Sequence, residues 1–595
     1  MLSLTTLLPA AEPDTDANLW LEDVEGARAM EWVRAHNAAT AERLGAQPDY
    51  ADLHRDALAI LNSTSRIPGV SQHGGYLYNL WQDPAHPRGL FRRTTLAEYR
   101  KASPNWETVL DVDELSRTEG KQWAFSGATW LEPEESRCLI HLAPGGSDAA
   151  EVREFDATKK TFVAGGFTLP VAKSRVAWRD ADSLYVATDF GPGSLTKSGY
   201  PSIVKIWQRG TPLSAAKMIY GGNPASVSVS AQRLRMAGGG EIDLLTEGLT
   251  FWTSEVSQIL GDRLVPLAVP PTARIIDGFH GRLVLSLKES WTFHGTTYPP
   301  DAVLLVDPSA LRGETGSVEM VIAPTPQAIV RNVAVTPAGL LVATLDNVRS
   351  RLDQFTPLAG GGWRREAVGF PDNGALNIIS TNSVTGDAFV EYESFLTPPA
   401  LYYVPAGSRT PEQLKTQAPT FDGTRFVVTQ NWTVSADGTK VPYFVVAPKG
   451  MKLDGKNPVW MFSYGGFEVA LTPAYSGSYE DMHGAYGKLW LERGGVFVLA
   501  NIRGGGEFGP AWHPSVLKEN HYKCYEDFEA VARDLAVHKI SSPAHIGIEG
   551  RSNGGLLVGS TMLRHPELYG AVVCGNPLLD MRRYHKLLAG ASWVG

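Results

Sequence analysis

The fold of this chain is decided by the stretch His545-Ile546-Gly547-Ile548-Glu549-Gly550-Arg551-Ser552-Asn553-Gly554-Gly555-Leu556-Leu557. An apolar segment with strand character leads into Gly550, and an apolar segment with helical character follows Gly554. Glycines two residues before and after Ser552 leave room for the strained turn that such a strand-to-helix junction needs. Because this turn pushes the serine hydroxyl out of the sheet, the stretch is interpreted as a nucleophile elbow, with Ser552 as the candidate nucleophile.

Strand-like and helix-like segments alternate around this elbow from about residue 421. A hairpin with its turn at Asp437-Gly438 comes first. The other expected elements are strands at 459–462, 496–500 and 546–548, and a helix at 525–538 whose Phe528, Val531, Leu535 and His538 form one buried stripe. Such alternation predicts a doubly wound, mostly parallel sheet covered on both faces. Residues 421–595 are therefore expected to form an α/β-hydrolase catalytic domain.

Residues 72–420 have a different character, with short strand-like runs separated by Gly, Pro, Asp and Asn turns. Examples are 76–81, 184–188, 282–287 and 340–345. An all-β region of this length suits several sandwiches or one propeller, and seven blades of roughly 50 residues would fill it. The preceding residues 1–70 are expected to be helical and to pack on the hydrolase domain.

The acid and the base that a serine nucleophile needs are not evident after Ser552. Asp580 is the only aspartate there, and His585 is one of two histidines. Both follow the next predicted strand at 571–574, which is one strand too early for the chain order of this fold. We therefore expect the catalytic Asp and His to lie beyond residue 595; the alternative is a chain that never carried them.

Composition excludes several classes of function. The net charge of −9 provides no basic surface for nucleic acid, and no run of 18 apolar residues predicts a membrane span. The cysteines Cys138, Cys524 and Cys574 are too far apart for a metal cluster or a disulfide framework, which favours a reducing compartment. The N-terminus lacks the positive region of a signal peptide. We therefore expect a cytoplasmic protein without metal or cofactor, with export to the periplasm or beyond as the alternative.

Two further glycine-rich segments follow predicted strands, at 463–467 and 501–509. Each alone is compatible with a simple turn after a strand. Together with the elbow, however, they place three glycine-rich strand ends at one sheet edge, where parallel sheets bind ligands. Glycines there let a backbone or side-chain donor approach a developing oxyanion.

At these segments the chain resembles the prolyl oligopeptidase family of serine peptidases, and within it the prolyl oligopeptidase branch. The matching segments are Tyr464-Gly465-Gly466-Phe467, 501–509, Tyr525-Glu526-Asp527-Phe528, 550–557, Leu579-Asp580-Met581 with His585-Lys586, Trp20-Leu21-Glu22-Asp23, Ser147-Asp148 and Arg153-Glu154-Phe155-Asp156.

The resemblance implies a seven-bladed β-propeller over an α/β-hydrolase domain, with a site between them that admits short peptides. It implies Ser552 as nucleophile, with the backbone N–H of Asn553 and the hydroxyl of Tyr464 as oxyanion donors. Phe467 and Trp593 match aromatic positions that form a pocket for proline, although Trp593 could also serve core packing. The family also implies a monomer without a cofactor.

The first functional hypothesis is thus a serine oligopeptidase that cleaves short peptides after proline. The alternatives are an esterase or acylaminoacyl-peptide hydrolase of the same fold, and a non-catalytic propeller scaffold or pseudoenzyme. The pairing of Phe467 with Trp593 argues against an ester hydrolase, which has no evident need for a slot shaped for proline.

Overall fold

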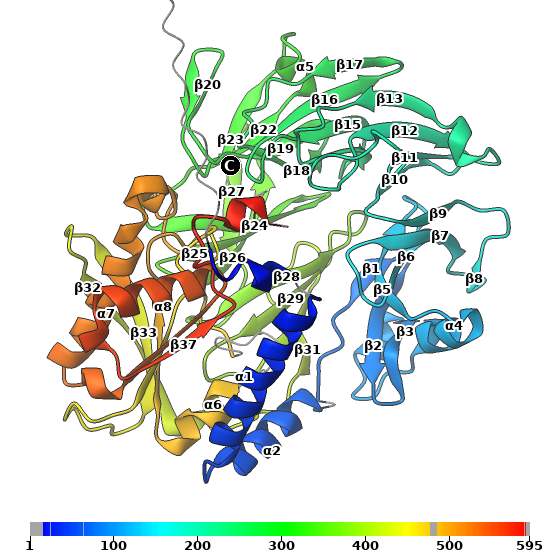
Figure 1. Ribbon diagram of the computed structural model, residues 1–595. Helices are drawn as coiled ribbons and strands as arrows, with labels where there is room; N and C mark the ends of the chain where they lie inside the picture. The colour runs from blue at the N-terminus through cyan, green and yellow to red at the C-terminus, as the bar shows by residue number, and fades with distance from the viewer. Residues whose placement is uncertain (1–15, 24, 64, 476–484, 588–589, 591–595) are drawn as a thin grey trace, which may run out of the picture. The chain divides into compact units, whose positions relative to one another are not determined.

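The computed structural model describes residues 16–23, 25–63, 65–475, 485–587 and 590 (Figure 1). The chain divides into two units, Met1–Ser63 and Thr64–Gly595. The first unit contains helices α1 (Ala27–Gly45) and α2 (Tyr50–Leu61). Large apolar side chains of these helices are exposed, among them Trp32 and Leu58.

Seven antiparallel sheets follow one another along the second unit (Figure 1). The first sheet consists of β1 (Ser71–His73), β2 (Tyr76–Asp83), β3 (His86–Thr94) and β4 (Glu107–Asp111), and the second of β5 (Trp123–Trp130), β6 (Arg137–Pro144), β7 (Ala150–Asp156), β8 (Thr161–Phe162) and β9 (Thr168–Ala172). The third sheet consists of β10 (Arg175–Asp180), β11 (Ser183–Ala187), β12 (Ile203–Gln208) and β13 (Lys217–Gly221). The fourth consists of β14 (Ser228–Arg235), β15 (Glu241–Gly248), β16 (Ser254–Leu260) and β17 (Arg263–Pro266).

The last three sheets have the same four-stranded plan. They consist of β18 (Arg274–Phe279), β19 (Arg282–Ser286), β22 (Val303–Val306) and β23 (Val318–Ile322); β24 (Ala328–Thr336), β25 (Gly339–Asp346), β26 (Arg349–Pro357) and β27 (Trp363–Ala367); and β28 (Ala375–Thr381), β29 (Ala388–Glu393), β30 (Ala400–Val404) and β31 (Glu412–Thr416). A separate hairpin is formed by β20 (Trp291–Phe293) and β21 (Thr296–Tyr298).

Each sheet is held between its neighbours by residues that alternate along the strands. In β25, Leu340 and Val342 pack in one cluster with the fifth sheet, whereas Leu341 and Ala343 pack in another with the seventh. Such burial on both faces explains why the strands read as continuous apolar runs. The first and seventh sheets are joined through Gln72 of β1, which donates to a backbone carbonyl of the seventh at 3.3 Å. The all-β region is thus a seven-bladed propeller, as predicted, and not a set of sandwiches.

The sheet that follows has six strands in the order β32-β33-β35-β34-β36-β37. These strands are β32 (Phe426–Val434), β33 (Lys440–Pro448), β34 (Val459–Phe462), β35 (Val496–Ala500), β36 (Ile546–Arg551) and β37 (Ala571–Gly575). The β32–β33 hairpin and the β33–β35 pair are antiparallel, and the other pairs are parallel. This mixed sheet confirms the predicted α/β-hydrolase fold.

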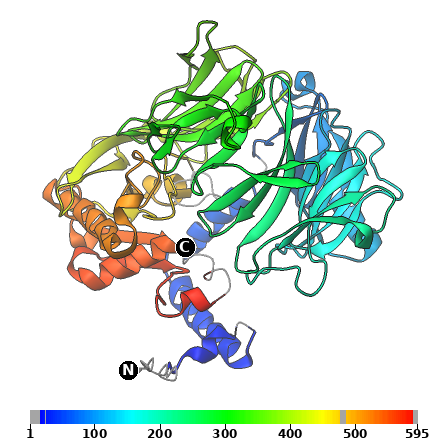
Figure 2. The same cartoon turned by 90° about the horizontal axis from the view of Figure 1, so that it is seen from above.

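Helices α7 (Tyr522–Val537) and α8 (Asn553–Arg564) lie side by side against this sheet (Figures 1 and 2). Phe528, Val531 and Leu535 of α7 are buried in the core beneath the sheet, as predicted. Burying each such side chain contributes about 1.5–3 kcal/mol. The prediction for His538 is wrong, because the helix ends at Val537 and the exposed ring bonds the Asp534 carbonyl at 3.0 Å.

The opposite face of the sheet is covered by a second apolar cluster. Phe444 and Phe497 of the sheet pack there against Tyr486 of α6 (Ala485–Leu489) and against Phe395 and Phe421 from the end of the propeller region. Both faces of the central strands are therefore buried, whereas the outer strands β32 and β37 keep exposed side chains such as Val427 and Val573. The remaining short helices are α3 (Leu96–Tyr99), α4 (Val112–Glu119), α5 (Pro308–Leu311) and the one-turn helices Leu19–Glu22, Leu213–Ala215, Gly423–Arg425, Leu491–Arg493, Pro514–Val516, Lys518–Asn520, Pro543–His545, Pro566–Leu568 and Tyr584–Lys586.

None of the described helices has the length and apolarity to cross a bilayer.

Candidate active site

Ser552 occupies the turn between β36 and α8. Its backbone has φ +54° and ψ −116°, a conformation that residues other than glycine rarely adopt. A Cβ on Gly550 would lie 2.0 Å from the carbonyl oxygen of Gly554, and one on Gly554 would lie 2.9 Å from the Ser463 carbonyl oxygen. The turn therefore requires glycine on both sides of the serine, which is the elbow geometry that the spacing predicts.

Three glycine-rich segments meet at this edge of the sheet, because the strands that they follow, β35, β34 and β36, are adjacent and parallel. The segments touch one another through their backbones. A Cβ on Gly504, which has φ +93°, would lie 2.3 Å from the carbonyl oxygen of Gly465. Glu468 N–H donates to the Gly504 carbonyl at 3.2 Å. The close approach accounts for the glycines in the segments at 463–467 and 501–509.

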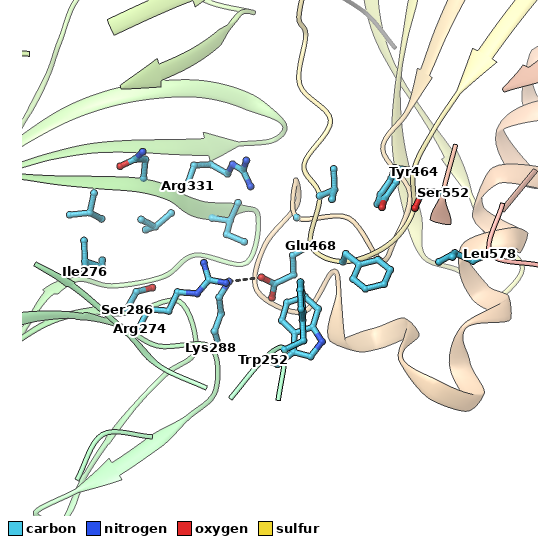
Figure 3. A pocket seen from close by; sticks show the side chains of 18 residues that line it. Trp252, Arg274, Ile276, Ser286, Lys288, Arg331, Tyr464, Glu468, Ser552 and Leu578 are labelled. Atoms are coloured by element: carbon cyan, nitrogen blue, oxygen red, sulfur yellow. Dashed lines mark hydrogen bonds and ion pairs between the residues drawn. The ribbon is translucent and has the colours of Figure 1, made fainter. Parts of the chain in front are cut away.

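Ser552, Tyr464 and Phe467 line one cavity of about 680 Å³ (Figure 3). The side chains of Tyr464 and Ser552 lie next to each other in this view, with their oxygen atoms on the same side. The propeller also lines the cavity, since Phe251 and Trp252 follow β15. The ring of Trp252 stacks near that of Phe467 with centroids 6.3 Å apart. The cavity thus combines a serine hydroxyl, a phenol hydroxyl and an aromatic wall.

Asn553 joins the start of α8 to the segment after β34. Its side-chain Nδ2 donates to the carbonyl of Tyr464 at 2.9 Å. Gly466 makes this possible, because a Cβ there would lie 2.3 Å from the same nitrogen. The backbone N–H of Asn553 belongs to the first helical turn, whose amides have no intrahelical acceptor and sit at the positive end of the helix dipole. An anion next to Ser552 would be stabilised by this amide.

A buried ion-pair network that the sequence did not indicate supports the segment after β35. The guanidinium of Arg503 contacts Asp527 of α7 at 2.6 Å and Asp437 of the β32–β33 turn at 2.6 Å. The hydrogen bond from Arg503 holds the pKa of Asp437 well below its usual range. Helix α7 begins at Tyr522 rather than at the expected Tyr525, and Asp527 lies beyond its first turn.

Glu507 is a second buried group that sequence reasoning missed. Its Oε1 accepts from the backbone N–H of Leu471 at 3.0 Å and from the side chain of Asn501 at 3.4 Å. Burial raises the pKa of this carboxyl to about 7. The interaction ties the segment that carries Phe467 to the segment after β35. A glutamate beside a glycine triplet was the only signal in the sequence.

The described histidines near the site are engaged elsewhere. His513 contacts the Gly504 carbonyl through Nδ1 at 2.9 Å, and His521 contacts the Val516 carbonyl through Nδ1 at 3.4 Å. His585 is exposed in a one-turn helix, and Asp580 is exposed just before it. In the part of the chain that the structure describes, no histidine ring hydrogen-bonds Ser552. Trp593 lies outside the described residues.

No group of three or more His, Cys, Asp or Glu side chains in the described ranges is arranged to hold a metal ion.

Comparison with known proteins identifies the same two parts of the chain. Residues 13–417 match the prolyl oligopeptidase N-terminal β-propeller domain, and residues 485–593 match the prolyl oligopeptidase family. The chain is 40% identical over 593 residues to an uncharacterized peptidase of Sinorhizobium fredii, covering 98% of this chain and 81% of the relative. It is 27% identical over 593 residues to a prolyl endopeptidase of Elizabethkingia meningoseptica, covering 98% and 78%.

Among solved structures, a post-proline cleaving enzyme from Rickettsia typhi superimposes with a TM-score of 0.89 at 31% identity. The match covers 97% of this chain and 85% of that structure. With its seven-bladed propeller, its hydrolase sheet and these matches, the chain belongs to the prolyl oligopeptidase family of serine peptidases.

Proposed function

We propose that this protein hydrolyses short peptides on the carboxyl side of proline, through an acyl-enzyme formed on Ser552. The observation that carries the proposal is the shared cavity, which brings the strained Ser552, the Tyr464 hydroxyl and the Phe467 ring together. The relatives named prolyl endopeptidase and post-proline cleaving enzyme support the substrate class.

In the proposed reaction, the Ser552 hydroxyl attacks the carbonyl carbon of the proline residue, gives its proton to a general base and forms a tetrahedral oxyanion. The Tyr464 hydroxyl and the Asn553 backbone N–H donate hydrogen bonds to this oxyanion. One such donor is worth about 3–4 kcal/mol of transition-state stabilisation. Collapse of the intermediate expels the amine and leaves an ester on Ser552, which water then hydrolyses.

Proline specificity is proposed to arise from the aromatic wall. Phe467 offers a flat apolar surface in the cavity, and the phenylalanine and tryptophan at 251–252 line the cavity next to it. Phe467 is proposed to contact the proline ring together with Trp593. Each additional methylene group that a proline ring buries there contributes about 0.8 kcal/mol, which suffices to favour proline over alanine several-fold.

The chemistry also needs a general base beside Ser552. Since no histidine among the described residues hydrogen-bonds Ser552, we propose that the 595-residue chain by itself has little or no peptidase activity.

The proposal is tested by digesting a mixture of unrelated short peptides with the complete gene product and mapping each cut by mass spectrometry. Cuts after proline are expected, and Ser552→Ala should abolish them. Cuts mainly after lysine or arginine would refute the proline preference. Hydrolysis of simple esters without any peptide cleavage would refute the peptidase function.

A further inference from the structure

The end of the cavity that lies away from Ser552 is strongly basic (Figure 3). Arg274 of β18, Lys288 just after β19 and Arg331 of β24 line it. Glu468 is the only acidic side chain among the described residues that line the cavity, and it forms an ion pair with Lys288 at 2.6 Å. Arg274 and Arg331 therefore bring positive charge to this space in a chain whose net charge is −9.

The two arginines are without a protein anion. Among the described residues, neither the Arg274 nor the Arg331 guanidinium forms a hydrogen bond or an ion pair, and both side chains are exposed to the cavity. Partial burial lowers the pKa of Arg331, whereas the charges of Glu507 and Glu468 act in the opposite direction. A partly buried cation that forms no hydrogen bond or ion pair gains from an anion that enters the cavity.

Irregular pairing of β24 and β18 occurs where these strands line the cavity. The pairing of β24 with β25 shifts register between Val330 and Asn332, which places Arg331 at a β-bulge. The neighbouring β18 shifts register in the same way around Ile276, which also lines the cavity. A bulge re-aims a side chain out of the regular alternation and is frequent beside active sites. The bulge at Arg331 is thus one reason that this side chain lines the cavity.

We propose that Arg274 and Arg331 form a subsite for a carboxylate of the bound peptide, at a distance from the cleaved bond. The carboxylate belongs either to an Asp or Glu side chain or to the free carboxyl terminus of the peptide. Guanidinium groups bind a carboxylate through paired hydrogen bonds, which fits this ligand. The inference rests on the proposed function, because a peptide anchored at Ser552 must be extended to reach the propeller end of the cavity. An extended peptide spans roughly 3.3–3.6 Å per residue, so the subsite would bind a peptide residue several positions from the cleaved bond.

The test measures peptide binding rather than turnover, using the whole chain with Ser552→Ala so that no peptide is cleaved. The probes share the sequence Ala-Pro-Ala-Ala-X and carry an acetylated amino terminus. X is glutamine amide in the neutral probe, glutamate amide in the second and glutamine with a free carboxyl terminus in the third. Calorimetric titration at low salt gives a Kd for each, and the second and third probes distinguish the two sources of the carboxylate.

At least one acidic probe is expected to bind about five- to tenfold more tightly than the neutral probe. The preference should shrink at high salt and disappear when Arg274→Gln and Arg331→Gln are combined. Arg263→Gln, which removes an exposed arginine of β17 outside the cavity, should leave it unchanged. Binding of the neutral probe to the double variant shows that the variant is folded.

Equal affinity for all three probes would overturn the carboxylate subsite while leaving the proposed peptide site intact. A preference that survives in the double variant would assign the carboxylate to other residues and would also overturn it. Failure of every probe, the neutral one included, would overturn the proposed function together with this inference.

Discussion

Three non-glycine residues of the site have backbone conformations that are energetically unfavourable for residues with a Cβ. Phe467, Glu468 and Ser552 each have φ +54°. A non-glycine residue in such a region costs on the order of 1–3 kcal/mol, so the surrounding structure must hold it in place. All three side chains line the same cavity, which concentrates the strain where a substrate would bind.

Tyr464→Phe tests the phenol as an oxyanion donor. Removal of one such donor should lower kcat by roughly 10²-fold or more, with little change in KM, because the hydrogen bond strengthens only as the oxyanion forms. Steady-state kinetics of the complete gene product on a proline-linked chromogenic peptide measures both constants.

Tyr402→Phe is the matched control, since that hydroxyl bonds Gln413 at 3.2 Å on the outer part of the seventh blade. It should leave kcat unchanged. A normal kcat for Tyr464→Phe would remove the phenol from the proposed reaction.

Glu507→Gln is expected to stabilise the protein at alkaline pH. The folded-state pKa of about 7 lies above the ordinary value of 4.5, so the folded protein binds a proton more tightly than the unfolded chain. Stability from this group is therefore present below pH 4.5 and is lost as the pH rises toward 7. The loss amounts to roughly 3 kcal/mol at most.

Urea unfolding of both proteins at pH 5 and pH 8 measures this effect. Glutamine cannot ionise, so the advantage of the variant should be larger at pH 8. An advantage that is the same at both pH values would show that Glu507 does not titrate in this range.

Among the elements, the β36–α8 junction is sensitive to a single added methyl group. Gly550→Ala would place a Cβ 2.0 Å from the Gly554 carbonyl oxygen, whereas a Cβ on Gly547 of the same strand has no heavy atom closer than 3.5 Å. We expect Gly550→Ala to lower the free energy of unfolding by about 2 kcal/mol or more and to abolish activity.

Gly547→Ala changes the same residue type in the same strand and should leave Tm within a few degrees of the wild type. Thermal unfolding followed by circular dichroism checks both variants. Equal Tm values for the two would contradict the crowded elbow.

A turn, strand or helix could be predicted from the sequence where a single local pattern of residues determines it. The elbow follows from the glycine spacing around Ser552, and the apolar run at 340–345 follows from burial between two blades. The network of Arg503 with Asp527 and Asp437 could not be predicted, because those partners lie 24 and 66 residues away and meet only in the folded sheet. His538 was misassigned because periodicity alone does not show where a helix ends.

At the scale of the whole molecule, the propeller and the hydrolase sheet build one cavity between them. The ion pair of Lys288 with Glu468 and the stacking of Trp252 near Phe467 cross from the propeller to the hydrolase sheet. The sequence indicated both folds but not these contacts, since no local pattern records which loops face each other. The packing of residues 1–70 on the hydrolase domain and the role of Trp593 stay predictions.

The 595-residue chain, purified by itself, is expected to cleave a proline-linked chromogenic peptide at a rate reduced by roughly 10⁴-fold or more relative to a serine peptidase with a complete triad. The reason is that no histidine among the described residues forms a hydrogen bond with Ser552. Initial-rate measurements, with peptide binding as evidence of a folded site, check this expectation. Turnover at rates ordinary for an enzyme would show that the chain itself supplies a base to Ser552.

Ser552 is proposed to be the nucleophile of a peptide-cleaving cavity. A fluorophosphonate probe reacts covalently with an activated serine, and peptide mapping then identifies the labelled residue. In the complete gene product we expect one label on Ser552, which is reduced by a proline-containing peptide inhibitor and is absent from Ser552→Ala. A label on another serine, or undiminished peptidase activity of Ser552→Ala, would contradict it.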